Sequence, residues 1–372
     1  MDLKDLAEIS RFYGSDPDIL LAGGGNTSCK DEQYLYVKAS GYRLADIGTD
    51  GFVRLNREAL DHIWKKQYPA DTETREHQAL LDLMNARAAG ETKRPSVESL
   101  LHAVLPWIYV VHTHPAIVNG LTCSIEGEKT AKRLFGSRCL WVPYVDPGYI
   151  LACRTKKLLE AHVKKNNSPP EIFFLASHGM FVGGNTAEEV LAVHRQVMET
   201  LRTRIIRMPD FTALTTETDQ EAVDKIAGKI KACPALGNAQ VVFQTNREID
   251  KLVYDASSFA VVHSAFTPDH IVYAGPESLF CADIKCLCED IDDYRRRFGC
   301  VPRIIAVRQT GIFAVGDSPG SARTALELFL DSIKVAVYAA SFGGGRFMTY
   351  QQINFIMHWE VEKFRARVSL GE

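Results

Sequence analysis

One block of the sequence occurs twice, and it constrains the fold more than any other feature. Residues 172–184 read IFFLASHGMFVGG, and residues 304–316 read IIAVRQTGIFAVG. Each block predicts a buried strand, a turn with glycine, an apolar–Phe pair, and then a cap and a long helix. Strand–turn–helix units can look alike by chance, but we favour a real, degenerate duplication. The repeat therefore predicts a chain with two related α/β parts.

The length agrees with two domains. The chain has 372 residues, of which 46% are hydrophobic, enough to form two apolar cores. The polar stretch 215–220 is the best linker candidate. We therefore predict a first domain at 1–215 and a second at 216–372, the second being a degenerate copy in which Thr310 replaces His178.

Charge and composition exclude several classes of protein. With 43 Lys+Arg against 46 Asp+Glu, the net charge of -3 predicts neither a nucleic-acid nor a membrane-surface partner. The N-terminal segment MDLKDLAEISRF lacks the apolar core of a signal peptide, and no apolar run is long enough for a transmembrane helix. The nine cysteines are odd in number and have no framework spacing, so we expect reduced thiols, Cys281, Cys286 and Cys288 included. These features favour a cytoplasmic enzyme.

Three histidines stand at the ends of predicted strands. His112 and His114 follow the apolar run Tyr109–Val111, and alternate residues of a strand project to the same side. His178 follows the strand 172–175, where a turn can bring a third nitrogen to the same place. Three imidazoles with an open position suit a catalytic zinc. A surface or supporting role for the His pair remains the alternative.

Two further segments allow two interpretations each. Glu98 begins a predicted helix over 97–105, either as a carboxylate that complements the helix dipole or as a general base near the metal. The loop 23–28, GGGNTS, is either a tight turn or a backbone cradle for a phosphate. It matches neither a P-loop nor a dinucleotide fingerprint.

Five separated blocks resemble the class II aldolase/adducin family. These blocks are GNTS at 25–28, SG at 40–41, PSVE at 95–98, HTH at 112–114 and HG at 178–179. Over nearly the whole chain, the sequence is most similar to the aldolase half of bifunctional rhamnulose-phosphate aldolase/short-chain dehydrogenase proteins. The segments 21–30, 37–41, 267–270 and 358–360 carry this likeness. Because the chain stops at Glu372, where the dehydrogenase half begins in those proteins, we expect a stand-alone aldolase-type subunit.

The resemblance implies a role for each block. His112, His114 and His178 become ligands of Zn²⁺ or another divalent cation, and Glu98 becomes the catalytic proton carrier. The residues implied in substrate and phosphate binding are Asn26, Thr27, Ser28, Ser40, Gly41 and Ser96. Val97 stands between serine and glutamate, where simpler members of the family have a second serine, and this leaves one phosphate donor undefined.

The resemblance also implies a fold and a reaction. The expected fold is α/β in three layers, with a central, mostly antiparallel sheet, followed by the degenerate second copy. The expected reaction is cleavage of a ketose 1-phosphate, such as rhamnulose or fuculose 1-phosphate, to dihydroxyacetone phosphate and an aldehyde by a homo-oligomer. A sugar-phosphate 4-epimerase or dehydratase with the same site is one alternative, and a non-catalytic, adducin-like binding protein is another.

Three more residues need an assignment. Members of this family often take a proton donor for the aldehyde oxygen from a tyrosine of a neighbouring subunit. Tyr144 and Tyr149 are candidates, although we expect both to be packing residues. His102, four residues after Glu98, is expected to support the site rather than to bind the metal.

Overall fold

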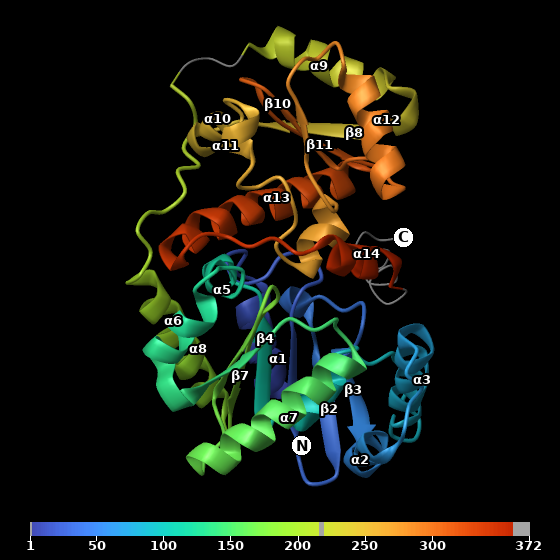
Figure 1. Ribbon diagram of the computed structural model, residues 1–372. Helices are drawn as coiled ribbons and strands as arrows, with labels where there is room; N and C mark the ends of the chain where they lie inside the picture. The colour runs from blue at the N-terminus through green and yellow to red at the C-terminus, as the bar shows by residue number, and fades with distance from the viewer. Residues whose placement is uncertain (1, 216–218, 360–372) are drawn as a thin grey trace. The chain divides into compact units, whose positions relative to one another are not determined.

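The computed structural model describes residues 2–215 and 219–359, which form two compact units (Figure 1). Unit 1 comprises Met1–Thr122 and Glu126–Arg204, and unit 2 comprises Cys123–Ile125 and Ile205–Glu372. The predicted boundary between residues 215 and 216 adjoins residues outside the described ranges, so it stays a prediction. None of the described helices combines the length and the apolar character needed to span a bilayer.

Unit 1 is built on a seven-stranded sheet of order β3-β2-β1-β4-β7-β6-β5. The strands are β1 (Asn26–Lys30), β2 (Tyr34–Lys38), β3 (Phe52–Asn56), β4 (Tyr109–Thr113), β5 (Cys139–Val142), β6 (Ile172–Leu175) and β7 (Gly179–Gly184). Only the β5–β6 pair is parallel, and all the other neighbouring strands are antiparallel. The predicted mostly antiparallel sheet is confirmed.

Helices cover both faces of this sheet and give the predicted three layers. The helices of unit 1 are α1 (Lys4–Gly14), α2 (Arg57–Lys65), α3 (Thr72–Asn85), α4 (Ser99–Val104), α5 (Ala116–Thr122), α6 (Gly127–Phe135), α7 (Tyr149–Asn166) and α8 (Ala187–Arg202). The alternation of β1 side chains distinguishes the two faces. Thr27 bonds to Ser10 of α1, whereas Ser28 bonds to His102 of α4. Helices α1 and α8 therefore lie on one face, and α4 lies on the other.

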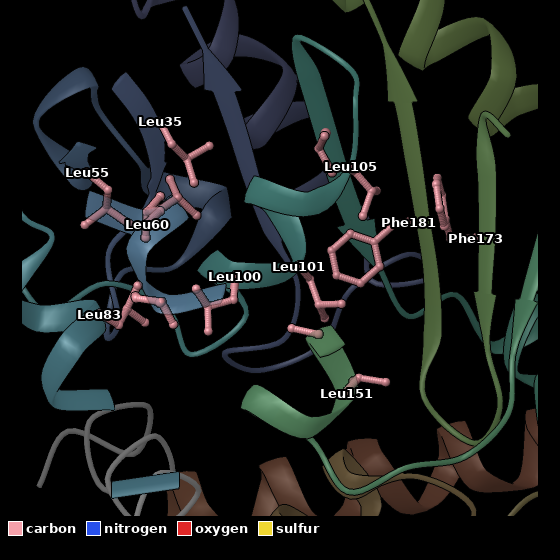
Figure 2. Close-up of a cluster of buried hydrophobic side chains, with 14 of the residues drawn as sticks. Leu35, Leu55, Leu60, Leu83, Leu100, Leu101, Leu105, Leu151, Phe173 and Phe181 are labelled. Atoms are coloured by element: carbon pink, nitrogen blue, oxygen red, sulfur yellow. The ribbon is translucent and has the colours of Figure 1, made fainter. Parts of the chain in front are cut away.

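The α4 face holds an apolar core that fixes the position of this short helix. Leu100, Leu101 and the following Leu105 pack with Phe181 of β7 and with residues of β2, β3 and α7 (Figure 2). All four of these side chains are at most 2% exposed. A helix of 6 residues is too short to be stable alone, so this packing, rather than helix propensity, holds it against the sheet.

Unit 2 has a four-stranded sheet of order β8-β11-β10-β9. Its strands are β8 (Gln240–Gln244), β9 (Leu279–Cys281), β10 (Ile304–Val307) and β11 (Gly311–Gly316). Its helices are α9 (Gln220–Ala232), α10 (Arg247–Leu252), α11 (Ala256–Phe259), the π-helix η5 (His270–Ala274), α12 (Leu287–Phe298), α13 (Pro319–Ala339) and α14 (Tyr350–His358). Short 3₁₀ turns complete the two units: Leu44–Asp46, Thr49–Gly51, Gly136–Arg138, Pro234–Leu236 and Ala340–Phe342.

The sheet of unit 2 has the same internal arrangement as β4-β7-β6-β5 of unit 1. In both sheets the first three strands are antiparallel neighbours, and the last strand runs parallel to the third. The turn between the two repeated strands contains a non-glycine residue at φ 55°, Ser177 in one unit and Gln309 in the other. Such a conformation is uncommon outside glycine, so its occurrence at matching positions strengthens the case for a duplication.

One expectation about the cysteines is wrong. Cys233, at the end of α9, forms a disulfide with Cys288 in the first turn of α12. The two residues lie 55 positions apart in the sequence, and no local spacing indicates this pairing. Cys281, Cys286 and Cys300 are free thiols, as expected.

Candidate metal and catalytic site

The three predicted histidines meet at one end of the unit 1 sheet. The Nε2 atom of His112 lies 2.8 Å from Nε2 of His114 and 3.3 Å from Nε2 of His178. His112 also lies 2.9 Å from the carbonyl oxygen of Met180 through Nδ1. That carbonyl can only accept, so Nδ1 carries the hydrogen and the lone pair on Nε2 faces the other two rings.

Strand pairing explains why His112 is so well fixed. His112 is opposite Asn26 on β1 and opposite Phe181 on β7, so the three side chains form a row on one face of the sheet. The His112 ring stacks on Phe181 at 4.0 Å between centroids and is fully buried. The imidazole is therefore held between its neighbours before any ligand binds.

The turn before β7 delivers His178, and Gly179 makes room for the other two rings. A Cβ atom on Gly179 would lie 2.5 Å from the Thr113 carbonyl oxygen and 2.7 Å from Cδ2 of His114. No side chain fits at those distances without displacing the neighbouring atoms. The sequence pair His178-Gly179 thus has a steric explanation.

Glu98 approaches the histidines from α4. Its Oε1 atom lies 3.3 Å from Nε2 of His112 and 3.4 Å from Nε2 of His178. Its other oxygen, Oε2, accepts a 2.5 Å hydrogen bond from Nδ2 of Asn26. Burial alone raises the pKa of Glu98, but His112, followed by His178 and His114, outweighs it and holds that pKa well below its ordinary value.

This geometry bears on the two interpretations of Glu98. The residue is at the N-cap position of α4, yet its side chain makes no capping hydrogen bond. It points instead to the histidines. A carboxylate that served only the helix would bond to the free N–H groups of the first turn.

The donor set fits a divalent cation. One ligand nitrogen from each of His112, His114 and His178 lies within 4.8 Å of the others. Beside them, Oε1 of Glu98 is buried and has no hydrogen-bond partner among the residues that the structure describes. A buried carboxylate oxygen is costly to leave in this way, and a cation at the histidines would compensate it. Three imidazole nitrogens are a common ligand set of catalytic zinc.

Three of the predicted phosphate-binding residues lie together. The backbone N–H of Ser40 donates to the carbonyl of Arg94, and Ala39 pairs with Pro95, so the Ser40–Gly41 loop runs beside Ser96. Ser96 Oγ accepts from the backbone N–H of Glu98 at 3.3 Å. Gly41, with φ 91°, is exposed at the surface. This loop pair thus adjoins the carboxylate.

The other three predicted binding residues have partners within the protein. Asn26 bonds to Glu98, as described, and also to His102. Thr27 bonds to Ser10 at 2.6 Å on the opposite face of the sheet, and Ser28 bonds to His102 at 2.6 Å. All three are at most 4% exposed. Their contact with a phosphate stays a prediction.

The two candidate tyrosines have other partners. The Tyr144 hydroxyl donates to Asp146 at 3.2 Å, and burial followed by the charge of Asp146 raises the pKa of Tyr144. Tyr149 packs against Tyr68 and Trp64, with ring centroids 4.7 Å and 6.2 Å away. Packing is what we expected of Tyr149.

The sequence interpretation missed Lys30, which lies on the same face of β1 as Asn26 and Ser28. Its ammonium group donates to the carbonyl oxygens of His102 and Leu105 at the end of α4. Burial lowers the pKa of Lys30 to about 7. The sequence could have indicated this position, because Asn26, Ser28 and Lys30 alternate along one strand and alternate residues project to the same face.

Unit 2 has none of the three histidines at the matching positions. The repeat places Phe313 at the position of Phe181, and the partner of Phe313 on β8 is Phe243, where unit 1 has His112. The same register places Thr245 at the position of His114, and Thr310 replaces His178.

Comparisons with known proteins match a family model to the first part of the chain and a curated relative to all of it. A family model described as Class II Aldolase and Adducin N-terminal domain matches residues 4–205. The chain is 23% identical over 415 residues to "Uncharacterized oxidoreductase YuxG" of Bacillus subtilis (strain 168), covering 100% of the chain and 59% of that relative. The chain thus spans less than two thirds of the length of this relative.

Two solved structures are similar to about half of the chain. The N-terminal class II aldolase domain of a conserved protein from Thermoplasma acidophilum is 26% identical, covering 55% of this chain and 93% of that one, with a TM-score of 0.46. The L-fuculose-1-phosphate aldolase from Thermus thermophilus is 15% identical, covering 54% and 92%, with a TM-score of 0.35. The family model covers more than half of the residues of this chain, and the chain therefore belongs to the class II aldolase and adducin N-terminal domain family.

Proposed function

We propose that unit 1 is a metal-dependent aldolase that cleaves a ketose 1-phosphate to dihydroxyacetone phosphate and an aldehyde. The observation that carries this proposal is the buried carboxylate of Glu98, whose Oε1 faces the convergent imidazoles and lies 3.3 Å from Nε2 of His112. A purely structural histidine cluster does not need an ionised carboxylate at its centre. Rhamnulose or fuculose 1-phosphate is the substrate we favour.

In this proposal His112, His114 and His178 hold Zn²⁺ or another divalent cation. Such a cation would supply Lewis acidity that stabilises negative charge developing on the substrate, an effect of roughly several kcal/mol. Ser40, Gly41 and Ser96 bind the phosphate group through hydroxyl and backbone donors. Because the phosphate is remote from the reacting bond, its binding fixes the substrate relative to Glu98.

In this reaction Glu98 transfers one proton to a carbon atom of the substrate. The bond between C3 and C4 of the ketose breaks, and the C4 hydroxyl gives its proton to the Glu98 carboxylate as it becomes the aldehyde. The bonding electrons stay on C3 as an enediolate, and Glu98 delivers a proton to C3 to give dihydroxyacetone phosphate. In the synthetic direction Glu98 removes that proton.

Sibling reactions use the same residues. A 4-epimerase acting on a pentulose phosphate breaks and reforms the same type of bond, and a dehydratase expels a hydroxyl group from a similar intermediate. An adducin-like binding protein needs neither the metal nor Glu98. Retention of the four site residues in unit 1 favours an enzyme over this last alternative.

The second domain enters the proposal as a degenerate copy of the first. The shared strand order and the matching turns at Ser177 and Gln309 support this, and Phe243, Thr245 and Thr310 provide no comparable metal ligands. We propose that this domain contributes packing or a subunit interface to a homo-oligomer. Light scattering of the purified chain measures that assembly directly.

The test is cleavage of a panel of ketose 1-phosphates by the zinc-loaded protein. We expect one member to release dihydroxyacetone phosphate and an aldehyde in equal amounts. His112→Ala should lose zinc and activity, whereas Glu98→Gln should keep zinc and lose about 100-fold or more in kcat. His62→Ala is the matched control, because His62 is exposed on α2. No aldehyde from any substrate would sink the aldolase assignment.

A further inference from the structure

Two elements of unit 1 meet through a chain of polar side chains beside Glu98. Strand β1 contributes Asn26 and Ser28, which project to the same face because they alternate. Helix α4 and its N-cap contribute His102 and Glu98, four residues apart and therefore one turn apart. The contacts run from Glu98 to Asn26, from Asn26 to His102, and from His102 to Ser28.

The direction of each hydrogen bond in this series follows from the orientation of the Asn26 amide. The Nδ2 amide group of Asn26 can only donate, and it donates to Oε2 of Glu98. The Asn26 carbonyl Oδ1 then faces Nε2 of His102, and it can only accept. Nε2 of His102 must therefore carry a hydrogen.

The opposite end of the His102 ring completes the order. The ring is fully buried, and this burial lowers the pKa of His102 to about 3, so the imidazole is neutral. A neutral imidazole with its hydrogen on Nε2 has a lone pair on Nδ1. The Ser28 hydroxyl, 2.6 Å away, donates to that lone pair.

We infer that His102 is a positioning residue: with Ser28, it orients the Asn26 amide so that Asn26 holds one oxygen of Glu98 and leaves the other to face the three histidines. Without the ring, nothing in these contacts prevents the Asn26 amide from turning its oxygen toward the carboxylate. The partly negative amide oxygen of Asn26 and the carboxylate oxygen of Glu98 would then repel each other, and the Glu98 side chain would move. This inference rests on the proposed role of Glu98 in catalysis.

The packing supports such a role. The terminal C–C bond of a glutamate side chain rotates easily, so a defined carboxylate needs an external partner. Glu98 has no capping bond to its own helix, and Asn26 is the partner of Oε2. The His102 ring itself is fixed by edge-to-face contact with Phe181, 5.3 Å between centroids, which is also the ring that supports His112.

The test compares His102→Gln with His102→Leu in the zinc-loaded protein. Glutamine can donate an amide hydrogen to Asn26 and leucine cannot. We expect kcat within about threefold of wild type for His102→Gln and about 10- to 100-fold lower for His102→Leu, with KM changing less than kcat. Zinc content should stay at the wild-type level in both variants, since the three ligands are untouched. Equal activity of the two folded variants would overturn the inference.

A spectroscopic measurement separates this inference from the reaction itself. In protein labelled with ¹⁵N-histidine, we expect a hydrogen on Nε2 and a bare Nδ1 for His102, assigned by the signal that His102→Gln lacks. A hydrogen on Nδ1 would refute the proposed order even if the protein is an aldolase. Conversely, the expected tautomer without any cleavage would retain the positioning network and refute the proposed function. If His102→Leu fails to fold, the tautomer and His102→Gln still decide.

Discussion

Replacing Gly179 with alanine tests the geometry of the histidine cluster. The new methyl carbon would lie 2.5 Å from the carbonyl oxygen of Thr113, 2.7 Å from Cδ2 of His114 and 3.5 Å from Cε1 of His112. The first of these contacts is with backbone inside the β4–β7 ladder, which cannot move without losing hydrogen bonds. The second contact can be relieved only by displacing an imidazole from its place in the cluster.

Overpacking of this kind costs about 1–3 kcal/mol. The displaced ring must return to the cluster before it can bind the ion, and the free energy needed for this weakens metal binding. Zinc affinity should therefore fall by roughly 5- to 150-fold. Competition with a chromophoric chelator measures the affinity, and chemical denaturation measures the stability of the metal-free protein. Gly228→Ala is the matched control: Gly228 is exposed in α9, and among the described residues only the backbone of its own helix comes within 4 Å of the new methyl group.

We expect Gly228→Ala to keep the zinc affinity of the wild type and to gain up to about 1 kcal/mol of stability, because alanine favours a helix. Wild-type zinc affinity and wild-type stability in Gly179→Ala would refute the reasoning. In that case the three rings would not occupy the positions from which the metal site is inferred.

Three further predictions concern stability. Lys30→Met removes a buried amine whose pKa is about 7 in the folded protein and near 10.5 in the unfolded chain. Between these pH values the unfolded chain binds more protons, so the stability of the wild type should rise with pH relative to that of the variant, by up to about 1.4 kcal/mol per pH unit. Denaturant titrations at a series of pH values measure this difference. Leu101→Ala should reduce the free energy of unfolding by about 2–5 kcal/mol, because Leu101 is 1% exposed between α4 and the sheet (Figure 2). Cys233→Ser should destabilise unit 2 by about 4 kcal/mol, since the disulfide closes a loop of 55 residues; a reducing agent should then lower the melting temperature of the wild type but not that of the variant.

Local patterns were enough to predict much of unit 1. The apolar run 172–175, predicted as a buried strand, is β6 with the same bounds. The spacing of His112 and His114 placed both rings on one side of β4. These features depend on neighbours within one element, and the sequence records them directly.

Contacts between distant segments could not be predicted in this way. The long helix expected after the first repeat block ends at Arg202, and Arg207 beyond it pairs with the buried carboxylate of Glu248 at 2.7 and 2.9 Å. No sequence pattern near residue 207 predicts an ion-pair partner 41 positions away in the chain. The disulfide of Cys233 escaped prediction for the same reason.

The site shows the same division. The expectation that His102 supports the site rather than binds metal needed only its spacing from Glu98. Its partners Asn26 and Ser28 lie more than 70 positions away and meet it only because β1 and α4 pack face to face. The orientation of the Glu98 carboxylate is therefore a property of the fold.

Hydrogen exchange of dihydroxyacetone phosphate in heavy water tests the central claim most directly, because it requires no knowledge of the aldehyde. If Glu98 moves a proton at the carbon that becomes C3 of the ketose, the zinc-loaded protein should replace one of the two hydrogens of the hydroxymethyl carbon with deuterium, as seen by NMR. Glu98→Gln should lose this exchange while keeping its zinc. Absence of exchange in the loaded wild type, or undiminished exchange in Glu98→Gln, would contradict the account.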